Sequence, residues 1–158
     1  MAVPEVIPIA YVPRDRTETI GRYAGGQFLA SISYAFPAGF QLDDGWEEYK
    51  RLYVVLHTFD TEGHYRDSDI WCAGNWAEQV RAPDGDESVL GRARIHLAKL
   101  LRSLPRRSYT DIAIRPFSVT HEGVRFGLVI REDEGEQWAE LYPDRLAFAE
   151  PWDGTYDT

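Results

Sequence analysis

Apolar and polar residues alternate over several short stretches of this chain, which is the pattern of β-strands that bury one face. One face of residues 27–36 carries Phe28, Ala30, Ile32 and Tyr34. Residues 18–24 are also strand-like, and Gly25 and Gly26 supply the positive φ angles that a two-residue turn needs. The pattern predicts a first β-hairpin here, followed by a loop over residues 37–48.

Two more hairpins follow from the same alternation. One pairs residues 51–60 with 64–72 around Gly63, and the other pairs 110–119 with 124–132 around Gly123. Short strands are also predicted at 138–142 and 145–152, interrupted by Pro143. The segment 74–86 is predicted to be an irregular connection.

Between these strands, apolar residues recur at spacings of three and four, which predicts one amphipathic helix. The stripe consists of Leu90, Ala93, Leu97, Leu100, Leu101 and Leu104. Asp84 and Glu87 resemble a capping box, and Pro105 ends the helix. The order of elements predicts an α+β fold, an antiparallel sheet built from consecutive β-hairpins with one long amphipathic helix packed on one face.

Length and composition indicate one cytoplasmic domain. The chain of 158 residues shows no repeat or linker, so we expect a single domain over 1–158, with 151–158 as a C-terminal tail. Cys72 is the only cysteine, which fits a reducing compartment, and no signal peptide is evident. Glycines and a proline break the longest uncharged run, so no membrane span is expected.

The second predicted hairpin places polar side chains together. With a three-residue turn, His57 lies opposite Asp67, Val55 opposite Asp69, and Tyr53 opposite Trp71, all on one exposed face. The other face carries Leu52, Val54, Leu56, Ile70 and Cys72 and is expected to pack under the helix. Cys72 is then a buried, unreactive thiol. A four-residue turn would instead place His57 opposite Arg66.

Two interpretations of this face stay open. In the catalytic one, His57 is a general base or metal ligand, Asp67 orients it, Asp69 is a further ligand, and Arg115 from the third hairpin holds an anion. In the structural one, which we favour, these are solvated charge pairs of a sheet face, with Arg115 in a salt bridge to Asp67 or Asp69. No cofactor or metal motif is present, and none is expected.

Aromatic residues supply a second set of candidates. Six are candidates for binding a partner: Tyr53, Trp71, Trp46, Trp76, Trp152 and Tyr156. For the aromatics in or beside predicted loops and ends, the simpler interpretation is that they clamp loops onto the domain; these are Trp46, Tyr49, Trp76, Trp138, Tyr142, Trp152 and Tyr156. The last two lie in the tail, which is expected to dock either on its own domain or on a partner.

The charge is strongly asymmetric. The net charge is −9, yet residues 88–110 carry six basic residues and no acid: Arg92, Arg94, Lys99, Arg102, Arg106 and Arg107. The acidic remainder makes nucleic-acid binding unlikely, because such binding requires neutralised phosphates. The basic segment is expected to pair with acids within the chain or across a homodimer.

Several runs, "IGRYAGGQFLASISYAFP", "SDIWCAGNWAEQ", "DIAIRPF" and "WAELYPDRLAFAEPWDG", resemble small actinobacterial proteins labelled formate hydrogenlyase regulatory protein-like. The resemblance spans most of the chain and implies a regulator that acts through protein contacts, without implying a role for any residue. The expected function is a non-enzymatic cytosolic interaction or regulatory module, of regulator, inhibitor or immunity type, acting on a protein partner through an acidic, aromatic-bearing surface. The alternative is a small enzyme or ligand- or metal-binding protein that uses the His57, Asp67, Asp69 and Arg115 cluster.

Overall fold

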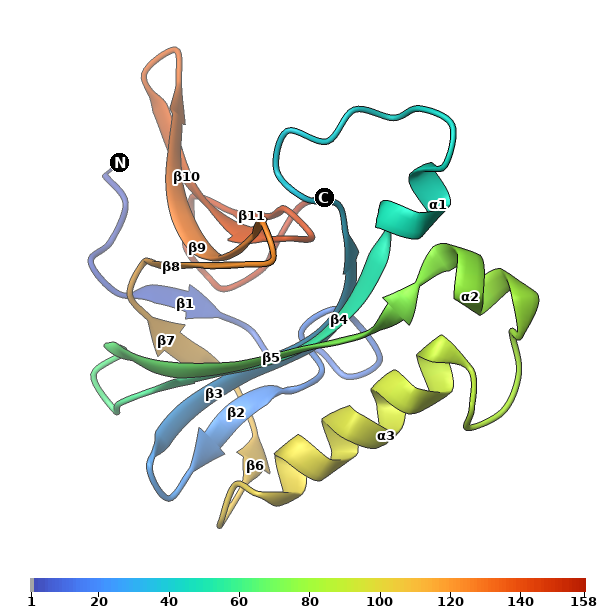
Figure 1. Cartoon of the computed structure of the whole chain (residues 1–158). Coiled ribbons are helices and arrows are strands. Elements are labelled where there is room, and N and C mark those ends of the chain that lie inside the picture. The colour runs from blue at the N-terminus through green and yellow to red at the C-terminus, as the bar shows by residue number, and fades with distance from the viewer. Residues whose placement is uncertain (1) are drawn as a thin grey trace.

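The computed structural model describes residues 2–158 and has the predicted α+β class (Figure 1). Within that range the strands form three antiparallel sheets. A five-stranded sheet has the order β5(Tyr65–Asn75), β4(Arg51–Phe59), β3(Gly26–Ala35), β2(Ile20–Tyr23), β6(Ser108–Tyr109). A four-stranded sheet has the order β11(Leu146–Phe148), β10(Glu136–Tyr142), β9(Val124–Asp133), β8(Phe117–His121). The third sheet pairs β1(Ile7–Ile9) with β7(Ile112–Ile114).

The long helix α3(Val89–Arg102) covers one face of the five-stranded sheet, as predicted (Figure 1). The alternation in β3 and β4 points Phe28, Ala30, Leu52, Val54 and Leu56 at the helical stripe. The predicted helix start is wrong, however. Ser88 is the N-cap, and its side-chain oxygen accepts the Gly91 N–H at 2.9 Å, so Asp84 and Glu87 form no capping box there.

The other face of the five-stranded sheet is covered too, which corrects the prediction of an exposed polar face. The four-stranded sheet and the β1–β7 pair pack against it and enclose the largest core cluster. Leu29 and Phe59 from the five-stranded sheet meet Ile7, Ile114 and Phe148 from the two smaller sheets there. The alternate residues of β4, beginning with Tyr53, are therefore interior residues.

The hairpins form where they were predicted, but they do not join one sheet. In the first, the turn residues are Ala24 and Gly25, one position earlier than the predicted Gly25 and Gly26. In the third, Glu122 and Gly123 both have positive φ and connect β8 to β9. Residues 112–114 leave that hairpin and pair with β1 instead. Two short helices, α1(Trp46–Tyr49) and α2(Trp76–Arg81), occupy segments predicted to be irregular.

The register of the β4–β5 hairpin differs from the predicted one. The predicted three-residue turn is confirmed, because the Asp60 N–H donates to the His64 carbonyl and Phe59 lies opposite Tyr65. The pairing then shifts by one residue, because Thr58 lies opposite Asp67 and not opposite Arg66. Arg66 is the extra, unpaired residue of a β-bulge. A slip of one residue moves the following side chains of β5 to the opposite face of the sheet, as far as a second register shift between Leu52 and Tyr53 of β4.

The slip corrects three placements in β5. Ile70 and Cys72 face the four-stranded sheet with Val55 and Phe126, not the helix. Trp71 takes the helix side. The Cys72 thiol is half-buried, and burial raises its pKa.

The C-terminal tail docks on its own chain, one of the two predicted outcomes. Asp157 bridges Ala147 by two backbone hydrogen bonds, and the Gly154 carbonyl accepts the Ala10 N–H at 2.9 Å. Trp152 and Tyr156 pack against the largest core cluster. In residues 2–158, no helix has both the length and the apolar character needed to cross a bilayer.

Candidate functional site

His57 is an interior residue. Its side chain lies between the two large sheets at 2% exposure, with its ring edge-on to Phe117 at 4.8 Å between centroids. Nδ1 is 2.5 Å from Ser68 Oγ, which is 2.7 Å from the Tyr65 hydroxyl. Burial lowers the pKa of His57 to about 3, so the imidazole is neutral at pH 7.

The other members of the predicted cluster lie elsewhere. The bulge at Arg66 turns Asp67 and Asp69 to the helix side of the sheet, where both are exposed. Arg115 contacts neither carboxylate, because its Nη1 pairs with Glu5 Oε1 at 2.7 Å. The His57, Asp67, Asp69 and Arg115 cluster is therefore not formed. Across the described residues, no three His, Cys, Asp or Glu side chains gather closely enough to hold a metal ion.

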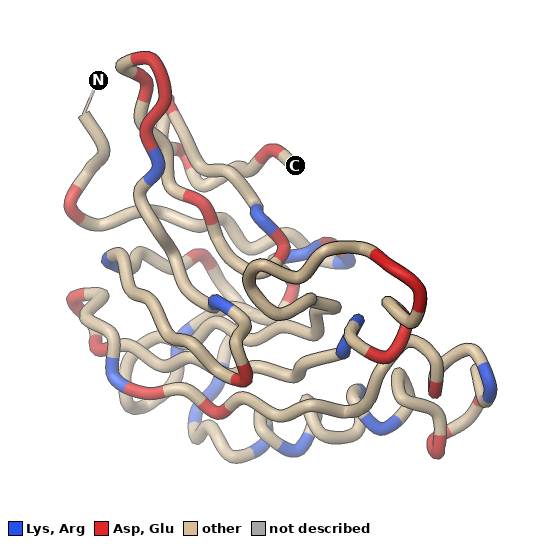
Figure 2. Tube along the Cα trace, turned by 45° about the horizontal axis from the view of Figure 1, so that its top comes forward, with Lys and Arg blue, Asp and Glu red and all other residues tan. Residues whose placement is uncertain are grey.

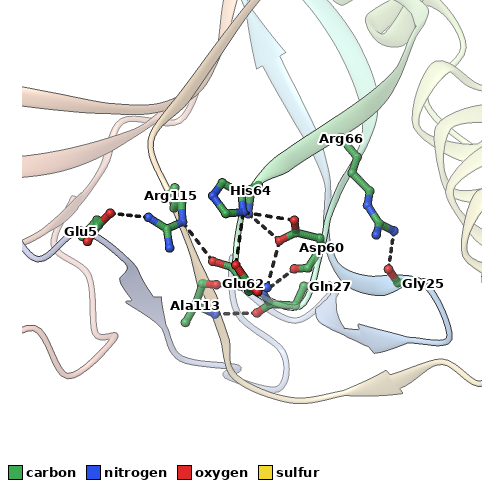
Figure 3. A network of polar contacts seen from close by, with 9 residues as sticks. All are labelled: Glu5, Gly25, Gln27, Asp60, Glu62, His64, Arg66, Ala113 and Arg115. Carbon is green, nitrogen blue, oxygen red and sulfur yellow. Dashed lines mark hydrogen bonds and ion pairs between the residues drawn. The ribbon is translucent and has the colours of Figure 1, made fainter.

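Arg115 belongs instead to a structural network at the β4–β5 turn (Figure 3). Its Nε donates to the Glu62 carbonyl at 3.1 Å, and its backbone N–H donates to the Gly63 carbonyl at 2.9 Å. Asp60 Oδ1 accepts the backbone N–H groups of Glu62 and His64, which fixes the turn. These bonds tie the turn to the end of β7.

Gln27, at the start of β3, also connects the β4–β5 turn to β7 (Figure 3). It is buried, and its side-chain amide accepts the Ala113 N–H at 2.8 Å and donates to the Ala113 carbonyl at 2.9 Å. The same amide nitrogen also donates to the Asp60 carbonyl at 3.1 Å. Gln27 thus satisfies both backbone polar groups of Ala113 in β7.

Two of the predicted binding aromatics are internal. Tyr53 is fully buried, its hydroxyl donates to Glu122 Oε2 at 3.1 Å, and burial raises its pKa to about 12. Trp71 stacks on His96 of α3 with ring centroids 4.2 Å apart. Both side chains fasten layers of the fold together.

Trp46 and Trp76 contribute to a cation–π cluster around Lys50. The ammonium nitrogen lies 4.7 Å from the Trp76 ring, 5.3 Å from Tyr34 and 5.9 Å from Trp46. The cluster holds α1 and α2 against the end of β4. With the tail residues Trp152 and Tyr156 packed on the core, the clamping role describes these four aromatics, whereas Tyr53 and Trp71 lie between layers of the fold.

A different aromatic group lies on residues 36–49, which we name the acidic aromatic loop. Phe36 and Phe40, both half-buried, stack with centroids 5.1 Å apart, and the tilted Tyr49 ring lies 5.0 Å from Phe40. Tyr49 is 43% exposed and Leu42 is 75% exposed. Sequence reasoning had singled out Tyr49 but missed Phe36 and Phe40.

The same loop is densely acidic. Asp43, Asp44, Glu47 and Glu48 are all exposed, and the loop contains no Lys or Arg. None of the four carboxylates has an ion-pair partner within residues 2–158. Figure 2 shows this acidic stretch apart from α3, along which the basic residues lie.

A second acidic feature is the far end of the β9–β10 hairpin, residues 131–137, which we name the acidic arm. It extends past its neighbours, because β8 pairs with β9 only as far as Leu128 and β11 reaches β10 only at Ala139 (Figures 1 and 2). Its tip carries four exposed acids, Glu132, Asp133, Glu134 and Glu136. The acidic arm lacks the stacked rings of the acidic aromatic loop.

An open pocket of about 500 Å³ adjoins the acidic aromatic loop. It is lined by Ala35, Phe36, Ala38, Thr120, Gly123, Val124, Arg125, Tyr142 and Pro143. The loop is fixed beside it, because the Ala38 N–H donates to the Gly123 carbonyl at 2.7 Å. Among the described residues of the lining, Arg125 is the one that carries a charge.

No protein-family model, curated protein or solved structure matches this chain. The resemblance to the formate hydrogenlyase regulatory protein-like group therefore stays a prediction.

Proposed function

We propose that this protein is a non-enzymatic, cytosolic regulatory module that binds a protein partner with a basic surface through the acidic aromatic loop. The observation that carries the proposal is the contact of Tyr49 with the stacked pair Phe36 and Phe40, on a largely exposed segment with four unpaired carboxylates. The resemblance noted in the sequence points to the same kind of role.

The composition of the loop matches what binding surfaces use. Aromatic side chains bury large areas with few rotatable bonds, and they dominate the energy of protein interfaces. Here the rings are already stacked and the loop is bonded to Gly123, so less conformational entropy is lost on binding. Carboxylates around the rings attract a basic partner and speed its association.

The direct test is affinity capture of the tagged protein from extracts of the source cells, at low and moderate salt, with native mass measurement of the eluate. Two variants remove the same number of charges. One neutralises the loop (Asp43→Asn, Asp44→Asn, Glu47→Gln, Glu48→Gln), and the matched control neutralises the arm (Glu132→Gln, Asp133→Asn, Glu134→Gln, Glu136→Gln).

We expect one stoichiometric partner that binds more weakly as salt rises, is lost with the loop variant and is retained with the arm variant. A dimer mass would identify the partner as a second copy, whose basic α3 meets the loop. Equal loss with both variants would mean nonspecific attraction and contradict the proposal. Recovery of the protein alone would contradict it as well.

A further inference from the structure

The pocket beside the acidic aromatic loop has mainly apolar walls built from three distant segments. Ala35, Phe36 and Ala38 come from the end of β3 and the loop, Val124 from the start of β9, and Pro143 follows β10. Its volume of about 500 Å³ lies in the range of small-ligand sites, roughly 300–1,000 Å³. Apolar walls of this kind suit an aromatic ring or a short alkyl chain.

The pocket also contains one cation without a counter-ion. The Arg125 guanidinium lies over the Tyr142 ring, 5.5 Å from its centroid, and within residues 2–158 it has neither an ion pair nor a hydrogen bond. The carboxylate of Glu122, in the turn between β8 and β9, contacts Tyr53 at 3.1 Å and Arg51 at 3.8 Å instead. The guanidinium fork of Arg125 is therefore available to a carboxylate in two-point geometry.

We propose that this pocket binds a small apolar monocarboxylate, with the carboxylate on Arg125 and the apolar part against Phe36, Val124 and Pro143. A single cation matches a single negative charge. Phosphate ligands need more, because the lining has no helix N-terminus and no second Lys or Arg. Cationic ligands are disfavoured by Arg125 itself.

This proposal goes beyond the interaction function and does not rest on it, because ligand binding is measured without a partner. The two sites do share Phe36, which stacks on Phe40 and also lines the pocket. A bound acid would contact the base of the acidic aromatic loop.

The test is an NMR titration of the isolated protein with sodium benzoate and, separately, sodium octanoate, following the backbone amides of Ala38, Thr120, Gly123 and Val124. Benzamide serves as the neutral probe of nearly the same shape. Arg125→Gln removes the proposed anchor, and Arg131→Gln is the matched control, because it makes the same change on the same strand in the acidic arm.

At least one carboxylate is expected to shift these amides saturably, with a dissociation constant in the millimolar range or tighter. Arg125→Gln and the use of benzamide should each weaken binding about tenfold or more, while Arg131→Gln leaves it unchanged. Absence of saturable shifts at about 10 mM of either acid would overturn the proposal. Equal binding of benzamide and benzoate to the unaltered protein would overturn it too, whether or not the variants fold.

Discussion

Acidification should weaken the folded state through His57. The ring is buried between the two large sheets, and its pKa falls from 6.5 to about 3 on folding. Between those values the unfolded chain binds a proton that the folded protein does not bind. The free energy of unfolding therefore falls as pH drops from about 6.5 toward about 3.

The magnitude follows from the two pKa values. Each pH unit well inside that window removes about 1.4 kcal/mol, so the change from pH 7 to pH 5 removes roughly 2 kcal/mol through His57. That loss is a substantial part of the stability of a typical domain, about 5–15 kcal/mol. Asp144 lines the same small cavity as His57, and burial raises its pKa, so its protonation acts in the opposite direction.

Urea unfolding at pH 7 and pH 5 measures the effect in the unaltered protein and in His57→Gln, which keeps a polar group near Ser68 but does not titrate. The quantity to compare is the pH-dependent difference, because glutamine also changes the packing. His64→Gln is the control, since His64 is an exposed histidine of the adjacent turn.

The unaltered protein and His64→Gln should each lose about 2 kcal/mol more than His57→Gln over this pH change. Identical pH dependence of all three proteins would refute the assignment of a neutral, buried imidazole. A loss that disappears in His64→Gln instead would place the effect at the turn.

Three further changes test the packing and polar contacts by denaturant unfolding. Gln27→Leu leaves the Ala113 backbone groups without partners and should lower stability by about 2–4 kcal/mol, and a change below 1 kcal/mol would show that water replaces the amide. Ser88→Ala removes the cap of α3 and should lower stability by about 1 kcal/mol, whereas Ser118→Ala on β8 should have little effect. Lys50→Met keeps an unbranched side chain one atom shorter but loses three cation–π contacts, with an expected loss of about 1 kcal/mol that salt barely alters; no loss would mean that the rings pack equally well around a thioether.

Alternation and turn chemistry predict much of this fold. The helix-facing residues of β3 and β4 and the stripe of α3 pack together as their spacing indicates. The second buried face also leaves a signal in the sequence of β4, where Tyr53 and Val55 are apolar between equally apolar neighbours. A strand that is apolar on both faces is typical of a buried sheet, and this pattern outweighs the single polar residue, His57.

The candidate site was less predictable, because one residue decides the register. Nothing in "HYRDSDIWC" marks Arg66 as a bulge, and both registers place a mixture of polar and apolar side chains on each face. The pocket around Arg125 depends on three segments that meet only after folding. The pattern of a single sequence indicates which residues of one strand share a face, but it does not indicate which distant segments meet to form a pocket.

The bulge in β5 has a consequence for how the protein behaves in concentrated solution. β5 forms one edge of the five-stranded sheet, and a long straight edge strand is a template for pairing with another molecule. The extra residue at Arg66 bends that edge, and Asp67 and Asp69 place like charges along it, so a second β5 approaching the same edge meets both misfit and repulsion. Deleting Arg66 would remove this bulge, one of two register shifts in the β4–β5 pairing, and is expected to increase aggregation through this edge.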